Sequence, residues 1–214
     1  MRTHPAFAGN SLHAVITGLL KVPVLLALVV IAGWAQPGHA QIQTLDDLDI
    51  SKSKVGGPFE LTGPGGSRVK LADFKGKVVM LAFGYTFCPD VCPTTLLEMA
   101  RAKKKMGDKA AGVQGVFITV DPKRDSADRL AEYVRHFDST FVGLTGTEKE
   151  IKSVGDKYMV RYRINKETKS AASYLVDHTT FMFLIDQKGK PRYVISYDQK
   201  TELLLEGLNR LLNE

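Results

Sequence analysis

Lys77-Val-Val-Met-Leu-Ala-Phe-Gly-Tyr85 is a nearly continuous apolar run, and Thr86-Phe-Cys-Pro-Asp-Val-Cys92 follows it directly. Such a run is typical of a strand that is buried on both faces. Apolar residues then recur at helical spacing from Cys92 to about Met106. The chain's two cysteines therefore lie where a buried strand gives way to a helix.

The segments around this junction predict an α/β protein. We expect further buried strands at 113–120 and 180–186, and helices at 126–137, 147–158 and 201–212. Two hairpins are expected as well, one joining 59–62 to 68–71 and one joining 180–186 to 192–196. Two crossover units make the first buried strands parallel, and the last hairpin adds an antiparallel edge. This order predicts a thioredoxin-like fold with an N-terminal β-hairpin and an insertion before the third core strand.

Composition excludes several classes of protein. The chain has 214 residues, of which 44% are hydrophobic and 24% charged, as in ordinary globular proteins. Its formal charge is +6, but residues 1–40 contribute Arg2 and Lys21 and no acid, which leaves 27 basic against 23 acidic residues. That balance, without a dense basic stripe, argues against nucleic acid as a partner. Two cysteines are too few for a disulfide-dense scaffold or a four-cysteine zinc module.

Residues 1–40 are predicted to be a signal peptide or an N-terminal membrane anchor. An apolar run of 14 residues, 22–35, follows Lys21, and Gly38-His39-Ala40 offers a cleavage site before Gln41. A spanning helix needs roughly 20 residues, which favours cleavage; counting back to Ala14 gives 22 residues, so an anchor stays open. Both outcomes export the protein to a bacterial periplasm, either free or anchored to the inner membrane. We expect a flexible approach at 41–56 and an ordered domain at 57–214.

The pair Cys88 and Cys92 is suited to thiol and metal chemistry. A helix N-terminus favours thiolate over thiol. Residues four apart on a helix share a face, with Cβ atoms about 5–6 Å apart, so the sulfurs can form a disulfide or hold one soft metal ion. A structural disulfide is the alternative. Its loop of three residues would restrain little of the unfolded chain.

One histidine is placed to join the cysteines. His4, His13 and His39 lie in residues 1–40, and His136 falls on a charged helix where we expect it at the surface. His178 precedes the strand expected at 180–186, on the loop that faces the cysteine loop in a thioredoxin-like fold. Two thiolates and an imidazole suit copper, and the sulfurs suit Cu(I) in particular. Zinc normally requires a fourth ligand or a water molecule.

Four motifs resemble the Sco/SenC family of copper-binding assembly factors for cytochrome c oxidase. They occur in family order over roughly residues 57–212, and they are Phe83-Gly-Tyr-Thr-Phe-Cys-Pro-Asp-Val-Cys-Pro93, Asp121-Pro-Lys-Arg-Asp125, Gly143-Leu-Thr-Gly146 and Asp177-His-Thr179. The resemblance implies that Cys88, Cys92 and His178 bind one copper ion per chain, as Cu(I), Cu(II) or both. It also implies that the partner is the apo copper subunit of the oxidase or another copper protein. Because a free cysteine pair tends to oxidise in the periplasm, we also expect a periplasmic thiol reductant as a partner.

A thiol–disulfide oxidoreductase acting on an apo copper protein is the alternative function, with Cys88 and Cys92 as its catalytic redox pair. Thioredoxin-like reductases typically have two residues between the cysteines, usually after a Trp, and a proline before the facing strand. Here three residues intervene after Phe87, and the facing segment, residues 176–180, has no proline.

Two polar segments, 121–125 and 103–105, can be explained by local structure. In the segment Asp121–Asp125, the last aspartate or Ser126 can cap the following helix, or the segment can surround the metal site. Lys103, Lys104 and Lys105 are expected to form a solvated helix face.

Overall fold

The computed structural model describes residues 44–165, 174–196 and 201–214, all within one compact unit, Ile42–Glu214. The signal peptide or anchor expected at 1–40 lies outside the described residues. Among the residues that the structure describes, no helix combines the length and the apolar character needed to cross a membrane.

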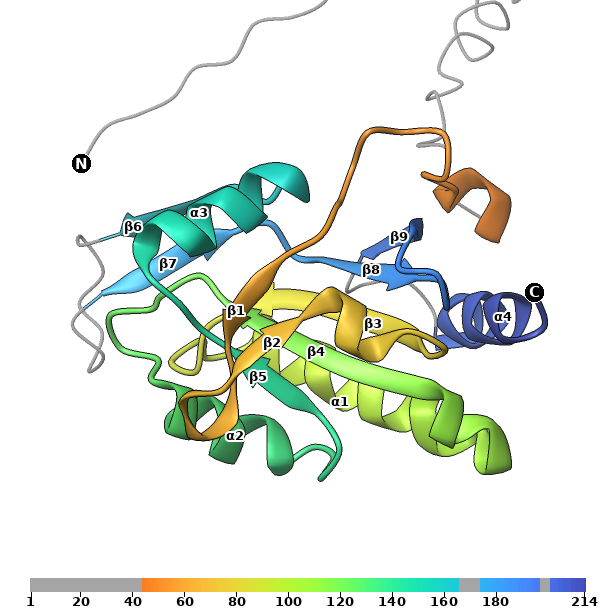
Figure 1. The fold of residues 1–214 in the computed structure, drawn as a ribbon, viewed down its shortest axis with the longest axis horizontal. Coiled ribbons are helices and arrows are strands. Elements are labelled where there is room, and N and C mark those ends of the chain that lie inside the picture. The colour runs from red at the N-terminus through yellow and green to blue at the C-terminus, as the bar shows by residue number, and fades with distance from the viewer. Residues whose placement is uncertain (1–43, 166–173, 197–200) are drawn as a thin grey trace, which may run out of the picture. The chain divides into compact units, whose positions relative to one another are not determined.

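A five-stranded mixed sheet forms the centre of the fold, in the order β5-β4-β3-β8-β9 (Figure 1). Its strands are β3 (Val78–Gly84), β4 (Val113–Thr119), β5 (Val142–Leu144), β8 (Phe181–Ile185) and β9 (Pro191–Ser196). Strand β3 is parallel to β4 and antiparallel to β8, and every residue in it is buried. The parallel pair and the antiparallel edge confirm the topology expected from the sequence.

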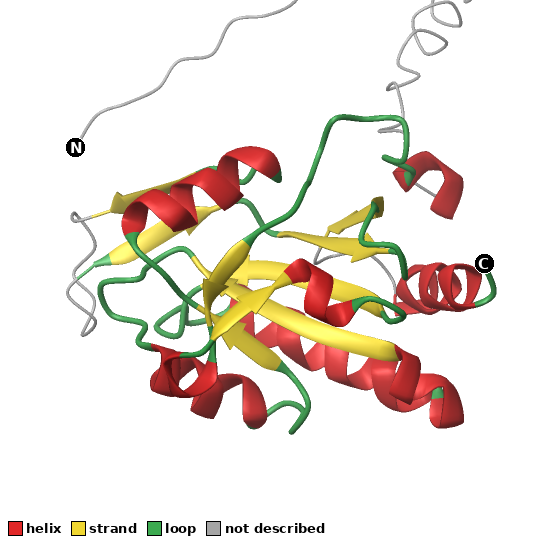
Figure 2. Ribbon diagram, viewed as in Figure 1, coloured by secondary structure: helices red, strands yellow, loops and turns green. Residues whose placement is uncertain are grey.

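The described part of the chain has four α-helices, which lie around the sheet (Figure 2). They are α1 (Val91–Lys105), α2 (Ala127–Arg135), α3 (Glu148–Lys157) and α4 (Thr201–Leu212). Helix α1 packs against β3, β4 and α4, while α2 packs against β5. Helix α2 packs closely against β5: a Cβ added to Gly143 of β5 would lie only 2.8 Å from the Cβ of Leu130 on α2.

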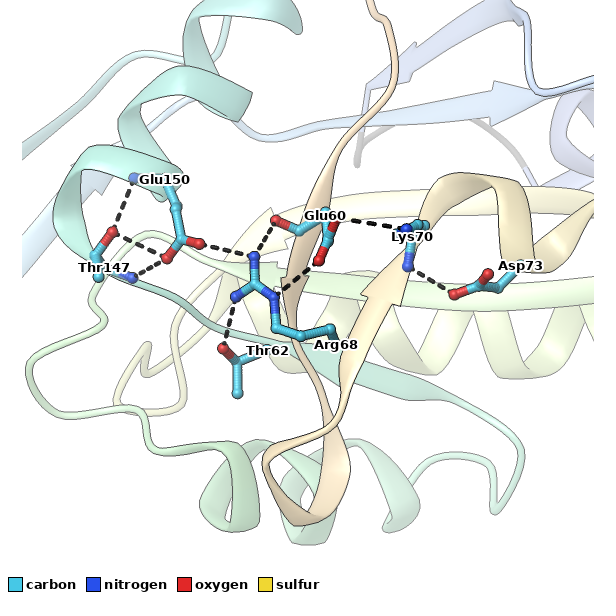
Figure 3. Close-up of polar contacts among 7 residues, drawn as sticks. All are labelled: Glu60, Thr62, Arg68, Lys70, Asp73, Thr147 and Glu150. Atoms are coloured by element: carbon cyan, nitrogen blue, oxygen red, sulfur yellow. Dashed lines mark hydrogen bonds and ion pairs between the residues drawn. The ribbon is translucent and has the colours of Figure 1, made fainter.

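The N-terminal hairpin, β1 (Glu60–Thr62) with β2 (Arg68–Lys70), is attached to two other elements. Thr62 exchanges two backbone hydrogen bonds of 2.8 Å with Thr145, which follows β5. The Arg68 guanidinium bonds both Glu60, on its own hairpin, and Glu150, on α3, the latter at 2.8 Å (Figure 3). The predicted hairpin is therefore confirmed, and it also ties α3 to the edge of the sheet.

An insertion separates α2 from β8, as expected, and the helix predicted at 147–158 is confirmed as α3. The other elements of the insertion were not predicted: β5 and a separate hairpin, β6 (Tyr162–Asn165) with β7 (Leu175–His178). We expected a loop at His178, which is instead the last residue of β7. Strands β5, β6 and β7 have only three or four residues, too few for a periodic pattern to be recognised in the sequence. They form because other strands pair with them, β4 with β5 and β6 with β7.

The described part of the approach segment 41–56, which begins at Thr44, contacts the rest of the domain. Leu45 and Leu48 are 1% and 5% exposed in a short 3₁₀ turn that contacts β9 and α4. The Ile50 N–H donates to the Arg192 carbonyl at 2.8 Å, and the Gly56 N–H donates to the Lys157 carbonyl at 2.7 Å. The apolar residues of this polar segment are ordered because the last strand and helix of the chain supply the surface they cover.

The expected solvated lysine face is wrong at one position. Lys104 and Lys105 are exposed, but Lys103 is 7% exposed. Its ammonium lies 3.6 Å from the Asp138 carboxylate and 5.8 Å from the centre of the Phe141 ring. The long lysine stem is buried while its charge reaches these partners.

Candidate metal and redox site

Three elements bring the predicted ligands together. Cys88 lies in the turn after β3, Cys92 is the second residue of α1, and His178 ends β7. Their Sγ and imidazole nitrogen atoms all lie within 4.8 Å of one another, and Cys92 Sγ is 3.4 Å from His178 Nε2. This confirms that His178 reaches the cysteine loop. Cys88 precedes the helix, in agreement with the helical spacing that begins at Cys92.

The two cysteines, neither of which is in a disulfide, differ in protonation. The Cys92 N–H, at the start of α1, donates to Cys88 Sγ at 3.4 Å. A hydrogen bond from the Cys92 thiol lowers the pKa of half-buried Cys88 to about 4. The same bond to Cys88, together with burial at 2% exposure, raises the pKa of Cys92. At neutral pH the pair is therefore a Cys88 thiolate beside a Cys92 thiol.

The His178 ring is oriented through its other nitrogen. Nδ1 lies 2.9 Å from the Thr179 carbonyl oxygen, which can only accept, so Nδ1 carries the proton. Nε2 then has a free lone pair directed at Cys92. The edge-on ring of Tyr85, 5.8 Å away at 84°, supports the imidazole from the side. Nε2 is thus the atom prepared to bind a metal ion.

Gly84, the last residue of β3, provides the space for the Cys92 sulfur. A Cβ at this position would lie 2.5 Å from Cys92 Sγ and 2.7 Å from Cζ of Phe117. We did not identify this residue from the sequence. One sequence signal could have identified it: Gly84 is the one glycine in the apolar run 77–85. Glycine within a strand often marks a place where another group packs closely against the backbone.

The segment Asp121–Asp125 serves both functions that we considered. Ser126 caps α2 by accepting from the Arg129 N–H at 3.2 Å. Asp125, which is fully buried, accepts from the Thr86 N–H at 3.0 Å and from the Thr86 hydroxyl at 2.6 Å. Burial raises the pKa of Asp125. Asp125 therefore holds the cysteine loop through Thr86, whereas His136 is exposed, as expected, and lies outside the site.

Two chemistries are open to this arrangement. Bonds from sulfur and nitrogen to a first-row metal ion are about 2.0–2.3 Å long, so ligands of one ion lie at most roughly 4.6 Å apart. A closure of the 4.8 Å cluster by a few tenths of an ångström would therefore place all three donors on one soft ion. The half-buried Cys88 thiolate can alternatively attack a disulfide, with Cys92 as the resolving thiol.

A family model described as SCO1/SenC matches residues 48–213. The chain belongs to the SCO1/SenC family. A SCO2-like protein of Rickettsia felis is 38% identical over 195 residues, which cover 91% of this SCO1/SenC chain and 93% of that protein.

Solved structures of this family share the thioredoxin-like fold. The crystal structure of Arabidopsis thaliana ScoI with copper bound is 37% identical, with a TM-score of 0.69 over 74% of this SCO1/SenC chain and 98% of that one. BsSco is described as having a disulfide switch and as a member of the Sco family of cytochrome c oxidase assembly proteins. At 21% identity and a TM-score of 0.59, over 75% of this chain and 94% of that one, its likeness concerns the fold.

Gly84→Ala should lower the free energy of unfolding by about 1–3 kcal/mol, because the added methyl group must displace Cys92 Sγ or the Phe117 ring. Urea unfolding measures the change. Gly155→Ala in α3 is the matched control, since its new Cβ would meet no atom nearer than 3.4 Å, and it should not destabilise the protein. Equal stability of Gly84→Ala and the unsubstituted protein would show that the close approach is not required.

Cys88 should remain a thiolate well below neutral pH. In the reduced, metal-free protein, thiolate absorbance and the rate of alkylation should rise through a midpoint near pH 4 and then stay level to pH 8, because the pKa is lowered to about 4. Cys92→Ala should move the midpoint upward by removing the strongest hydrogen bond. Cys88→Ser should leave Cys92 unreactive over the same range. A Cys88 midpoint near the ordinary value of about 8.5 would contradict the geometry.

Proposed function

We propose that the chain is an exported copper metallochaperone that binds one copper ion through Cys88, Cys92 and His178 and assists assembly of the copper centre of cytochrome c oxidase. The observation that carries this proposal is the convergence of two sulfurs and one imidazole nitrogen within 4.8 Å. Membership of the SCO1/SenC family and likeness to a copper-bound relative support it.

The protonation states suggest how copper is taken up. The Cys88 thiolate, half-buried, is the first ligand, since it needs no deprotonation at neutral pH. Cys92 binds next and releases its one proton, so the affinity for copper should fall as the pH falls. Nε2 of His178 completes the set. Two thiolates suit Cu(I), and the imidazole makes the same site suitable for Cu(II).

The unequal burial of the three ligands suggests the order in which they release copper to a recipient protein. Cys92 is 2% exposed, whereas Cys88 and His178 are half-buried. Ligands of a recipient can therefore replace Cys88 and His178 first and Cys92 last. The recipient we propose is the apo copper subunit of the oxidase or another copper protein, and the transfer is a ligand exchange without turnover of a small substrate.

The proposed location is the periplasm, with residues 1–40 removed before Gln41 or retained as an anchor in the inner membrane. A free pair of cysteine thiols tends to oxidise in that compartment. A disulfide between Cys88 and Cys92 would remove both sulfurs from the site. A periplasmic thiol reductant must then supply two electrons, and one proton must return to Cys92, before copper can bind again.

The asymmetry of the two cysteines also favours the second candidate, a thiol–disulfide oxidoreductase. The Cys88 thiolate would attack one sulfur of a partner disulfide and release the other as a thiolate. Cys92 would then lose its proton to that thiolate and attack Cys88 Sγ, which releases the second sulfur of the partner as a thiolate that takes a proton from water. The chain is left with a Cys88–Cys92 disulfide, and the external reductant resets it.

Copper content should depend on the state of the thiols. The reduced protein should retain about one copper per chain after gel filtration with a competing chelator, and the oxidised protein should retain none, because a disulfide is a poor ligand. Cys88→Ser and Cys92→Ser should each abolish tight binding. His136→Ala, which changes an exposed histidine outside the site, should bind copper normally. Equal copper in the reduced and oxidised proteins would overturn the coupling.

His178→Ala separates the two candidate functions. Thiol exchange needs both cysteines but no imidazole ligand, so this variant should reduce a disulfide peptide at near the normal rate. Copper binding should weaken, and the variant should fail to restore oxidase assembly in a deletion strain at limiting copper. His136→Ala should restore it. If His178→Ala restores assembly fully, copper handling is not the essential function and the oxidoreductase takes its place.

A further inference from the structure

The hairpin that carries His178 is not part of the central sheet. Strands β6 and β7 form a two-stranded sheet of their own, with no ladder to the five-stranded sheet among the described strands. An isolated two-stranded hairpin is marginally stable in water. The position of His178 relative to the cysteines therefore depends on contacts at the ends of β7 and between side chains.

Arg124 holds the residue before β7. From the loop between β4 and α2, its Nη1 donates to the Tyr174 carbonyl at 3.0 Å. The centre of the guanidinium lies 3.5 Å from the centre of the Tyr174 ring, so the two groups stack. Tyr174 directly precedes β7, and His178 is four residues further on.

Asp121 completes this contact from the same loop. Its carboxylate, on a residue that is 3% exposed, forms an ion pair with Arg124 and accepts from the Tyr174 hydroxyl at 2.9 Å. The Asp121 N–H donates to the Thr119 hydroxyl at 2.9 Å, which fixes the loop to the end of β4. Tyr174 is thus held at its ring, its hydroxyl and its carbonyl.

Tyr85 forms the second contact, next to the cysteine loop. Its hydroxyl accepts from the Val176 N–H at 3.2 Å, and its ring meets the imidazole of His178. The Arg124 guanidinium lies 5.6 Å from the centre of the same ring. Tyr85, 2% exposed, therefore contacts β7 at its second and fourth residues.

We propose that Asp121, Arg124, Tyr174 and Tyr85 are positioning residues that hold β7 against the cysteine loop and so place His178 Nε2 beside Cys92 Sγ. The inference rests on the proposed copper site. The basis of the inference is that one five-residue loop, Asp121–Asp125, contacts both the cysteine loop and the residue that precedes β7. Asp125 bonds Thr86 of the cysteine loop, while Asp121 and Arg124 hold Tyr174.

A double-mutant cycle tests whether this network acts through the imidazole. Loss of a group that orients a metal ligand typically costs 10–100-fold in metal affinity, so Arg124→Gln should weaken Cu(II) binding by about tenfold or more. In a His178→Ala background the same change should have less than about a twofold effect, because the ligand it positions is gone. Lys123→Gln, on the same loop but exposed and paired with Glu148, is the matched control and should bind normally.

A milder variant and a metal-free measurement complete the test. Tyr174→Phe removes only the bond from the Tyr174 hydroxyl to Asp121 and keeps the stacked ring, so it should fold normally and weaken copper binding less than Arg124→Gln. In the reduced, metal-free protein, both variants should accelerate hydrogen exchange at the Val176 amide. The amides of β3 and β4 should keep their protection, which distinguishes release of β7 from general unfolding.

Two results would overturn the proposal. One is that Arg124→Gln weakens copper binding equally with and without His178, which would mean that the network supports the thiolates or the whole fold. The other is unchanged Val176 exchange in both variants. If the unsubstituted protein binds no copper, the proposed function fails, but the exchange experiment still decides whether the network holds β7.

Discussion

Burial of the Cys92 sulfur against the end of β3 is the contact on which the rest of the site depends. Gly84 leaves room for this sulfur, and no larger residue would do so without displacing Cys92 or Phe117. Once Cys92 is held there, its N–H faces Cys88 Sγ and its own sulfur faces His178 Nε2. A single side chain at the strand–helix junction thus connects the site to the core.

The same burial makes the two cysteines chemically unequal. The hydrogen bond from the Cys92 thiol to Cys88 lowers the pKa of Cys88 to about 4 and raises the pKa of Cys92, and burial of the Cys92 sulfur raises the pKa of Cys92 further. Cys88 is therefore a thiolate at neutral pH, whereas Cys92 is a thiol that ionises only when another group takes the place of its proton. A soft metal ion or a mixed disulfide can do so, which is why one site is suited to both candidate functions.

The site also shows how a short loop can organise distant segments. The loop Asp121–Asp125 follows β4, at the same edge of the sheet as the cysteine loop after the parallel strand β3. From there Asp125 reaches Thr86, and Asp121 and Arg124 reach Tyr174. The buried carboxylates are stable in this position because each accepts hydrogen bonds or pairs with a cation, as buried charges require.

The sequence by itself determined the features that local patterns encode: the buried strand before Cys88, the helix after it, the final helix at Thr201–Leu212, and the presence of two cysteines and a histidine in facing segments. The tertiary structure alone decided the positions of β5 and β7, the burial of Lys103, the order of the segment around Leu45, and the contacts of Gly84 and Tyr174. The physical reason is the range of the interactions. Helices and long buried strands can be predicted from the spacing of apolar residues that are near one another in the sequence. Short strands, buried charges and close packing contacts form only because residues from other segments of the chain contact them.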